Sequence, residues 1–369
     1  TLTINPSADL AYASSYKVEF APGSIRDLAG NPYAGTTSYN FTTAAAPRSL
    51  TGTLATDILI GAEGGDSLTA LAGNDILIGR GGNDSLDGGS GLDTAVYGSN
   101  RAGYTVSRGA SDWLVTGAEG QDSLRNIERL HFADVTLAFD VEGNAGQTYR
   151  LYQAAFNRTP DFAGLGGWIH GMDQGLTLLQ VAASFIDSAE FRSLYGANPD
   201  DGQFVTLLYD NVLHRAPDSG GFGYWVDQLA SGAQTRAQVL AGFSESAENQ
   251  AALLPIIQNG MVFTEPVRFT GTAGADILIG TAGADSLSAL AGNDTVIALG
   301  GNDSIDGGAG IDTVVFSGDR ARYSISLTGA VRDVQDTAGP DGADRLANVE
   351  RLQFADVNLA FDVDGNAGQ

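Results

Sequence analysis

The hydrophobic positions along this chain follow two different rhythms. From residue 52 to 96, and again from 271 to 315, an apolar residue returns every nine residues, two positions after an aspartate. Glycine-rich stretches separate these positions, so each unit predicts a tight turn followed by a very short strand. Between residues 148 and 250 glycine becomes scarcer and the apolar period becomes helical, as at Leu178, Val181, Ala182 and Phe185. The pattern therefore predicts two repeat blocks with a helical segment between them.

Aspartate and glycine keep this nine-residue register in both blocks, whereas a Gly/Asp-rich flexible linker would not hold apolar residues in step with its turns. We take these residues as candidate metal ligands because carboxylates supply charge and exposed glycine turns supply carbonyl oxygens. The aspartates are Asp57, Asp66, Asp75, Asp84 and Asp93, and Asp276, Asp285, Asp294, Asp303 and Asp312. The glycines, two residues before an aspartate, are Gly64, Gly73, Gly82 and Gly91, and Gly283, Gly292, Gly301 and Gly310.

These units resemble the RTX calcium-binding nonapeptide, G-G-x-G-x-D-x-U-x, in which U is apolar. In that family two nonapeptides make one coil of a parallel β-roll. The resemblance thus implies that aspartates eighteen residues apart stack on one another. The stacked pairs would be 57 with 75, 75 with 93 and 66 with 84, and 276 with 294, 294 with 312 and 285 with 303. Ala70, Ala289 and Ala298 stand where the repeat has its first glycine.

Stacked coils place like charges close together. Neighbouring strands lie about 4.8 Å apart, and two carboxylates at about 5 Å repel by roughly 3 kcal/mol at an effective dielectric near 20. A calcium ion between coils reverses the sign, with turn carbonyls completing its shell of oxygen ligands. We therefore expect several Ca²⁺ ions, three or more per roll, and expect the blocks to fold only when calcium is bound.

Each block is followed by a similar β-rich flank, with D-x-L-x-N-I/V-E-R-L-x-F-A-D at residues 122–134 and 344–356. It resembles the segment that closes an RTX roll, and we expect it to cap the exposed edge of the last coil. Asp122 and Asp344 could each ligate one more calcium.

The helical segment is duplicated. LYQAAFNRTPDFAGLGGW and LYDNVLHRAPDSGGFGYW align at a shift of 57, and Thr177 with Gln180 and Thr235 with Gln238 fit helix-start capping boxes. The segment resembles a helical family of unknown function that is similar to phycobilisome linker domains. Arg158 and Arg215 are expected to pair with carboxylates of the domain, the alternative being a ligand site. Trp168 and Trp225 are expected in the core rather than as sugar platforms.

The remaining chain changes the picture in three ways. Residues 1–46 alternate apolar and polar positions and resemble the last strands of a bacterial Ig-like domain, with D-L-A-G-N-P before Y-N-F-T-T. The net charge of -25 disfavours nucleic acid and anionic membranes, and the lack of cysteine excludes disulfides. No H-E-x-x-H or G-x-S-x-G motif is present, and the three histidines have no histidine counterparts in the duplicated segments, so we expect no enzyme.

The expected fold is multidomain: a partial Ig-like β-sandwich (1–46), a β-roll with its cap (48–147), an all-α domain (148–254) and a second capped β-roll (262–369). The resemblance implies a calcium-dependent structural or adhesive module of a large bacterial surface protein, such as an RTX adhesin, an S-layer or a matrix component. Type I secretion would carry it outside the cell. Calcium is the expected partner, besides surface glycans or copies of the chain itself. The alternatives are a non-catalytic tail of a secreted hydrolase or toxin, and a glycan-binding helical domain.

Overall fold

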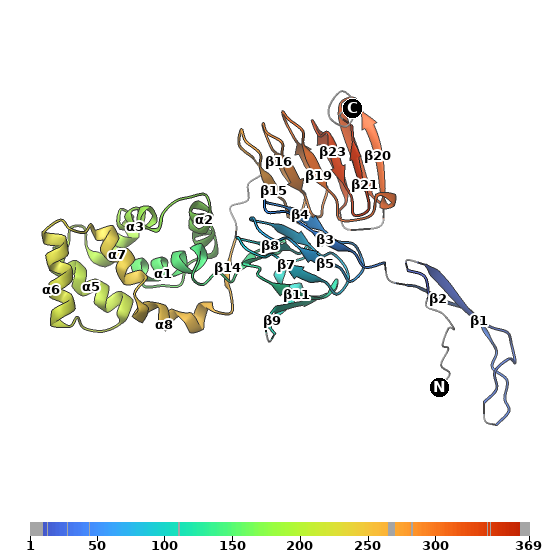
Figure 1. Cartoon of the computed structure of the whole chain (residues 1–369), viewed down its shortest axis with the longest axis horizontal. Helices are drawn as coiled ribbons and strands as arrows, with labels where there is room; N and C mark the ends of the chain where they lie inside the picture. Colours follow the sequence, from blue (N-terminus) through green and yellow to red (C-terminus); the bar gives the residue numbers. More distant parts are fainter. Residues whose placement is uncertain are drawn as a thin grey trace.

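The computed structural model describes residues 10–361, except residues 13, 28, 44, 110, 265–269, 282, 338 and 340. Figure 1 shows two β-rich bodies side by side, a helical body at one end and a two-stranded arm at the other. The arm is the antiparallel pair β1 (Ser15–Phe20) and β2 (Thr36–Thr42). Among residues 10–46 that are described, no second sheet packs on this pair, so the arm shows strands without a sandwich.

The first repeat block has two parallel sheets that the chain visits in alternation. Each strand pairs with the strand eighteen residues further on, so that Leu59 lies beside Leu77 and Leu68 beside Leu86. One sheet contains β3 (Ser49–Thr51), β5 (Ser67–Thr69) and β7 (Ser85–Asp87), and the other contains β4 (Ile58–Ile60), β6 (Ile76–Ile78) and β8 (Thr94–Val96). The apolar residue two positions after each aspartate points inward, and Leu68, Leu77 and Ala95 are fully buried.

Antiparallel strands close the far edge of both sheets in the first block, as expected for a cap. One sheet ends in β11 (Gly120–Arg125), β10 (Trp113–Gly117) and β9 (Thr105–Arg108). The other ends in β12 (Arg129–His131), β13 (Thr136–Ala138) and β14 (Met261–Phe263). Strand β14 comes after the helical segment, so the chain leaves this sheet and returns to it.

The second repeat block has the same plan. One sheet has the order β15 (Ile277–Ile279), β17 (Thr295–Ile297), β19 (Thr313–Val315), β23 (Arg351–Gln353), β24 (Asn358–Ala360). The other has the order β16 (Ser286–Ser288), β18 (Ser304–Asp306), β22 (Ala343–Ala347), β21 (Val331–Asp336), β20 (Tyr323–Thr328). The inward residues Leu278, Leu287, Val296, Ile305 and Val314 form its core.

The helical segment consists of two similar halves around one apolar core. The first half contains α1 (Asn144–Phe156), α2 (Phe162–Asp173), α3 (Leu178–Ile186) and α4 (Ala189–Tyr195). The second contains α5 (Asp201–Leu213), α6 (Ser219–Ala230), α7 (Arg236–Ser244) and α8 (Ala247–Ile257). Both expected capping boxes are present, at Thr177 for α3 and at Thr235 for α7. Asp161 and Asp218 cap α2 and α6 by accepting from glycine main-chain N–H groups.

Two expected domain boundaries need correction. Residue 148 lies inside α1, which begins at Asn144 because Asp140 accepts the Ala145 N–H at the helix start. Residues 262 and 263 belong to β14, whose pairing with β13 places them in the first block's sheet. The helical segment is therefore an insertion whose two ends meet at one strand pair, an arrangement that Figure 1 shows at β14.

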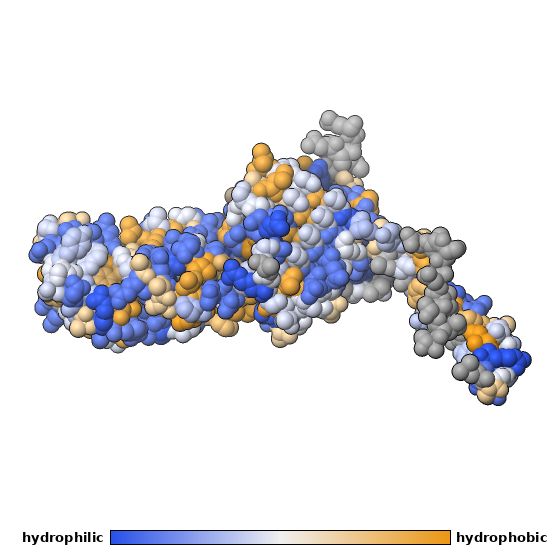
Figure 2. Space-filling model, turned by 60° about the horizontal axis from the view of Figure 1, so that its bottom comes forward, coloured by the Kyte–Doolittle hydropathy of each residue, from blue (hydrophilic) through white to orange (hydrophobic). Residues whose placement is uncertain are grey.

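The two repeat blocks contact each other through aliphatic side chains that point outward from their sheets. Ile60, Ile76 and Val96 of the first block cluster with Ile297 and Val315 of the second. Two arginines reinforce this contact, since Arg80 donates to the Phe316 carbonyl and Arg48 to the Ala355 carbonyl. On the face drawn in Figure 2 the joined blocks mix hydrophobic and hydrophilic residues, while hydrophilic residues prevail over the helical end.

Candidate calcium-binding turns

The registered aspartates form ladders along both edges of each block. In each block, the main-chain N–H of each of the first three aspartates donates to the Oδ1 atom of the aspartate eighteen residues further on. The N···O distances are 2.7 Å from Asp57 to Asp75, 2.8 Å from Asp66 to Asp84 and 2.9 Å from Asp75 to Asp93. In the second block they are 2.8 Å from Asp276 to Asp294, 2.8 Å from Asp285 to Asp303 and 2.9 Å from Asp294 to Asp312. The structure thus brings together the six pairs that the repeat register implies.

The second carboxylate oxygen divides these turns into two kinds. We call a turn closed when Oδ2 accepts the N–H of the residue four positions earlier. Closed turns precede Asp57, Asp66, Asp276 and Asp285, whose Oδ2 atoms accept from Thr53, Ala62, Thr272 and Thr281. We call a turn open when the buried Oδ2 has no hydrogen-bond partner. Open turns precede Asp75, Asp84, Asp93, Asp294, Asp303 and Asp312.

The backbone explains the difference between open and closed turns. In every open turn the residue four positions before the aspartate has a positive φ, for example 78° at Leu71 and 69° at Arg80. The glycine two positions before the aspartate is also left-handed in open turns, with φ between 125° and 146° at Gly73, Gly82, Gly91, Gly292, Gly301 and Gly310. Gly64 and Gly283 belong to closed turns and are absent from the positive-φ residues described. The closed turns form the first coil of each block.

Glycine is required in open turns by close contact as well as by φ. A Cβ atom on Gly91 would lie 1.6 Å from the Gly73 carbonyl oxygen, since consecutive coils approach at this point. The open Oδ2 atoms point back toward their own turns: a Cβ on Gly88 would lie 2.6 Å from Oδ2 of Asp93. Each open turn therefore gathers main-chain groups around a buried carboxylate oxygen that has no donor.

These orphaned oxygens fit a calcium ion. A buried carboxylate oxygen without a partner costs free energy unless a cation or a proton satisfies it. Among the described residues, no three or more His, Cys, Asp or Glu side chains converge on one metal position. A calcium ion at an open turn would thus take one or two carboxylates and fill the remaining positions of its 6–8 oxygen ligands from turn carbonyls.

Burial and like charge shift the pKa values of these carboxyls upward. Desolvation raises the pKa of Asp84 to about 7; the main-chain N–H of Asp66 opposes this shift, and the carboxylates of Asp122 and Asp66 add to it. Burial likewise raises the pKa of Asp93, Asp303 and Asp312 to about 6. Without a cation, protonation of these carboxyls removes their buried charge and so stabilises the folded chain.

The ladders end on residues of the two flanks. Asp84 and Asp303 donate from their N–H groups to Asp122 and Asp344, so these two aspartates continue one ladder in each block. Burial raises the pKa of Asp344 to about 8. The other ladder ends on glutamates that sequence reasoning missed, because Asp93 donates to Glu128 and Asp312 to Glu350, both at 2.9 Å. Their signal was present in the motif N-I/V-E-R-L that both flanks share.

The other singled-out residues have structural surroundings. Arg158 pairs with Glu190 at 2.6 Å and Arg215 with Glu248 at 2.8 Å, so both have the expected carboxylate partners within the domain. Trp168 and Trp225 pack at the edge of the helical core, where Trp168 meets the Phe185 ring at 5.2 Å between centroids. These contacts favour a structural role for the two arginines and the two tryptophans over a ligand-binding one.

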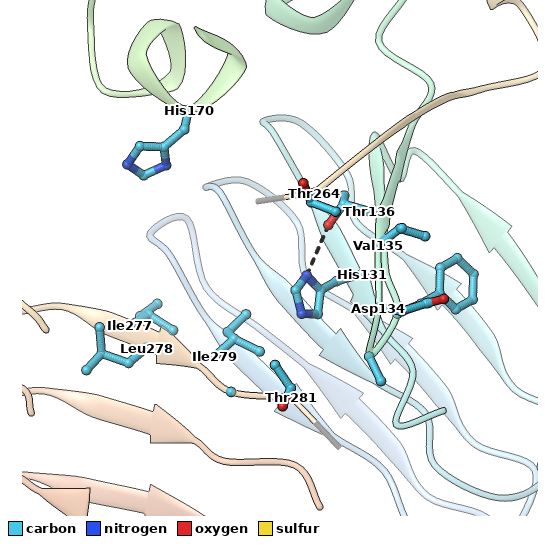
Figure 3. A pocket seen from close by; sticks show the side chains of 13 residues that line it. His131, Asp134, Val135, Thr136, His170, Thr264, Ile277, Leu278, Ile279 and Thr281 are labelled. Atoms are coloured by element: carbon cyan, nitrogen blue, oxygen red, sulfur yellow. Dashed lines mark hydrogen bonds between the residues drawn. The ribbon is translucent and has the colours of Figure 1, made fainter. Parts of the chain in front are cut away.

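Two histidines line a small cavity of about 220 Å³ where the helical segment and the two blocks meet. Figure 3 shows His170 entering from α2 and His131 from β12, with Ile277, Leu278 and Ile279 of β15 below. His131 lies 3.1 Å from the Thr136 hydroxyl. His214 is exposed at the end of α5, where its φ of 53° terminates the helix. The lining of the cavity mixes apolar residues with His, Thr and Asp.

Comparison with known families agrees with this division of the chain. Residues 52–95, 270–303 and 279–314 match the RTX calcium-binding nonapeptide repeat. Residues 1–43 match a bacterial Ig-like domain, and residues 182–253 match a domain of unknown function, DUF4214. The chain therefore carries calcium-binding RTX repeats, joined to an Ig-like segment and to a helical domain of unknown function.

Whole-chain comparisons add little. A search of the curated proteins found no match. Among solved structures, the extracellular lipase LipA from Serratia marcescens aligns over 83% of this chain and 38% of its own, at 13% identity and a TM-score of 0.25. The chain thus spans well under half of that lipase, and the likeness is too low to carry an argument. Within the described residues, no helix has the length and apolarity needed to cross a bilayer.

Proposed function

We propose that each repeat block is a calcium-set β-roll, and that the chain is a structural module of a secreted bacterial surface protein. The observation that carries this proposal is the set of six open turns, each with a buried carboxylate oxygen that lacks a donor. Calcium would be held at these turns, three in each block, by Asp75, Asp84, Asp93, Asp294, Asp303 and Asp312 with neighbouring turn carbonyls. The bound ion supplies positive charge between carboxylates that otherwise repel.

The closed turns have a different role in this proposal. Their aspartates already have hydrogen-bond donors for Oδ2, so Asp57, Asp66, Asp276 and Asp285 begin each roll without needing an ion of their own. Their Oδ2 atoms still satisfy main-chain N–H groups in the first coil of each block. Ten registered aspartates thus divide into six that favour calcium and four that close the roll's end.

A structural role fits the chemistry of the whole chain. With a net charge of -25, the metal-free chain resists compaction, and bound calcium reduces this repulsion. Cytosolic calcium is too low to fill sites of the extracellular class, whose Kd is around 10⁻⁴–10⁻³ M, so such a module would remain unfolded until export. We propose type I secretion, attachment at the cell surface as part of an adhesin, an S-layer or a matrix, and no catalytic role for these residues.

Localisation tests the surface role. Antibodies against residues 144–257 should label intact cells of the producing bacterium in millimolar calcium. Chelation by EGTA should unfold the repeat blocks or release the protein, so that less of it is retained on the cells. Labelling only after cell lysis would contradict the proposal. A catalytic domain on the full-length protein, with all activity retained when residues 48–361 are deleted, would favour the alternative of a non-catalytic tail.

A further inference from the structure

The two halves of the helical segment differ in what covers them. The second half follows the first at an offset of 57 residues through α1–α2 and α5–α6. In the first half, the face made by α1 and α2 holds strand β14: Met261 and Phe263 are buried in one cluster with Tyr149, Leu165 and Ile169. Figure 1 shows α2 beside β14, while α5 and α6 lie at the end of the molecule away from the repeat blocks.

The corresponding positions of the second half are open. Leu165 and Ile169 are each 1% exposed, whereas their counterparts Phe222 and Val226 pack along the edge of the helical core and remain only half-buried. The counterpart of the buried Tyr149 is Thr206, which is exposed. Helix α2 fully buries four residues and α6 buries none. The duplicated face thus carries a strand in the first half, whereas no described strand lies on the partly apolar face of the second.

A glycine shows what kind of segment the covered face accepts. A Cβ on Gly166 would lie 1.9 Å from the Thr264 carbonyl oxygen, and Thr264 donates from its N–H to the Phe162 carbonyl at 3.2 Å. An extended main chain thus runs directly over this glycine. Its counterpart Gly223 has the same place on α6, yet nothing described lies within 4 Å of a Cβ built there. The second half therefore has open space above Gly223 where the first half has a strand above Gly166, and no described strand occupies it.

The open face also has a cavity next to that gap. It has a volume of about 560 Å³, and its lining includes Gly202, Thr206 and Phe222. These are the counterparts of Ala145, Tyr149 and Leu165, which form the covered cluster in the first half. The replacement of tyrosine by threonine removes a ring at this point, so the cavity has room for an aromatic side chain of a partner.

We propose that the α5–α6 face is a docking groove for an extended peptide strand of a partner protein, bound as β14 is bound by α1–α2. The strand would point apolar side chains into the groove at alternate positions and insert an aromatic one, as Met261 and Phe263 do against the first half. The groove's lining is apolar apart from Asp200, Gln203 and Thr206, which favours a peptide over a sugar. This inference does not depend on calcium binding.

A peptide with the sequence of residues 259–265, Asn-Gly-Met-Val-Phe-Thr-Glu, is a direct probe. We expect the fluorescein-labelled peptide to bind the full chain saturably in fluorescence anisotropy with millimolar calcium present. Gly223→Leu should weaken binding at least tenfold, because the new side chain occupies the gap. Gly167→Leu is the matched control, since Gly167 is an exposed glycine of α2 with nothing described within 4 Å of its Cβ position. Both changes replace a helical glycine, so neither threatens folding.

The peptide supplies a second control. Its variant with Ser in place of the phenylalanine should lose most of its binding, whereas the Gly167→Leu protein should bind the original peptide like wild type. The absence of saturable binding would overturn the proposal, as would equal affinity of the Gly223→Leu and wild-type chains, which would place the peptide elsewhere. Binding of a polysaccharide that Gly223→Leu abolishes, with no peptide binding, would identify a sugar site and also overturn it.

Discussion

At the scale of the residue, the account depends on the two oxygens of one carboxylate. Oδ1 of each aspartate from the second coil onward accepts a main-chain N–H from the preceding coil, as Asp84 does from Asp66. Oδ2 is either satisfied by its own turn or left buried and unpartnered. The Oδ2 atom therefore has a hydrogen-bond donor at Asp66 and none at Asp84. A metal ion or a proton must make up the difference.

The pair Asp84 and Asp66 tests this distinction. Asp84→Asn should remove at least one calcium ion per chain and raise the calcium concentration for half-folding about tenfold, equivalent to about 1.4 kcal/mol. Asp66→Asn should leave the calcium stoichiometry unchanged. In the wild-type chain the Oδ2 atom of Asp66 already accepts the Ala62 N–H, so it is not expected to bind an ion. Titration calorimetry and circular dichroism would measure both. Equal loss of calcium in the two variants would contradict the division into open and closed turns.

The raised pKa values predict opposite pH dependences with and without calcium. In the unfolded chain these carboxyls have pKa values near 3.8, whereas in the folded chain Asp84 and Asp344 have values of about 7 and about 8. The metal-free folded chain binds more protons, so the stability from these groups is full below about pH 4 and declines as pH rises toward 8. In EGTA, the strand signal of the repeat blocks in circular dichroism should therefore be stronger at pH 5 than at pH 8. In calcium, protons compete with the ion, and the affinity should fall as pH drops below about 7. A calcium affinity that rises on acidification would refute this.

At the scale of the element, the turns and strands show what the sequence could and could not predict. The period of nine located one inward apolar residue in each repeat strand that follows an aspartate, because a side chain two positions after the aspartate faces the interior between the two sheets. The period did not distinguish open from closed turns, since that depends on the backbone conformation of each turn. Nor did it find Glu128 and Glu350, which lie outside the repeat and meet the ladders only in three dimensions.

Three leucines occupy the second glycine position of open turns in left-handed conformation: Leu71 with φ of 78°, Leu290 with φ of 75° and Leu299 with φ of 68°. A left-handed conformation costs a non-glycine residue about 1–2 kcal/mol, while glycine loses roughly 0.5–1 kcal/mol more chain entropy on folding. Since Leu290 is 48% exposed and buries little, Leu290→Gly should stabilise the calcium-bound chain by up to about 1 kcal/mol.

A helical leucine of similar exposure is the control for that change. Leu179 of α3 is 44% exposed, and Leu179→Gly should destabilise the helical segment by about 1 kcal/mol because glycine is a poor helix former. Urea unfolding followed by circular dichroism would compare the two variants. If Leu290→Gly destabilised the chain as much as Leu179→Gly, the left-handed strain assigned to the turn would be wrong.

At the scale of the whole molecule, the repeat blocks, the helical insertion and the arm differ in how their stability arises. The helical halves share an apolar core with aromatic contacts and capping boxes, and this core needs no ion. The blocks have narrow cores and charged edges. The sequence predicted this order of segments but not that the blocks pack together, because the outward isoleucines at 58, 60, 76 and 78 look like ordinary strand residues until a partner face is known.

Hydrogen exchange measured by mass spectrometry tests the central claim most directly, because it locates protection along the full chain. In millimolar calcium, the amides of residues 58–96 and 277–315 should exchange slowly, like those of α1–α8. In EGTA at pH 7.5, the account predicts that protection is lost in both repeat blocks while the helices remain protected. Unchanged protection of the repeat blocks in EGTA would contradict it.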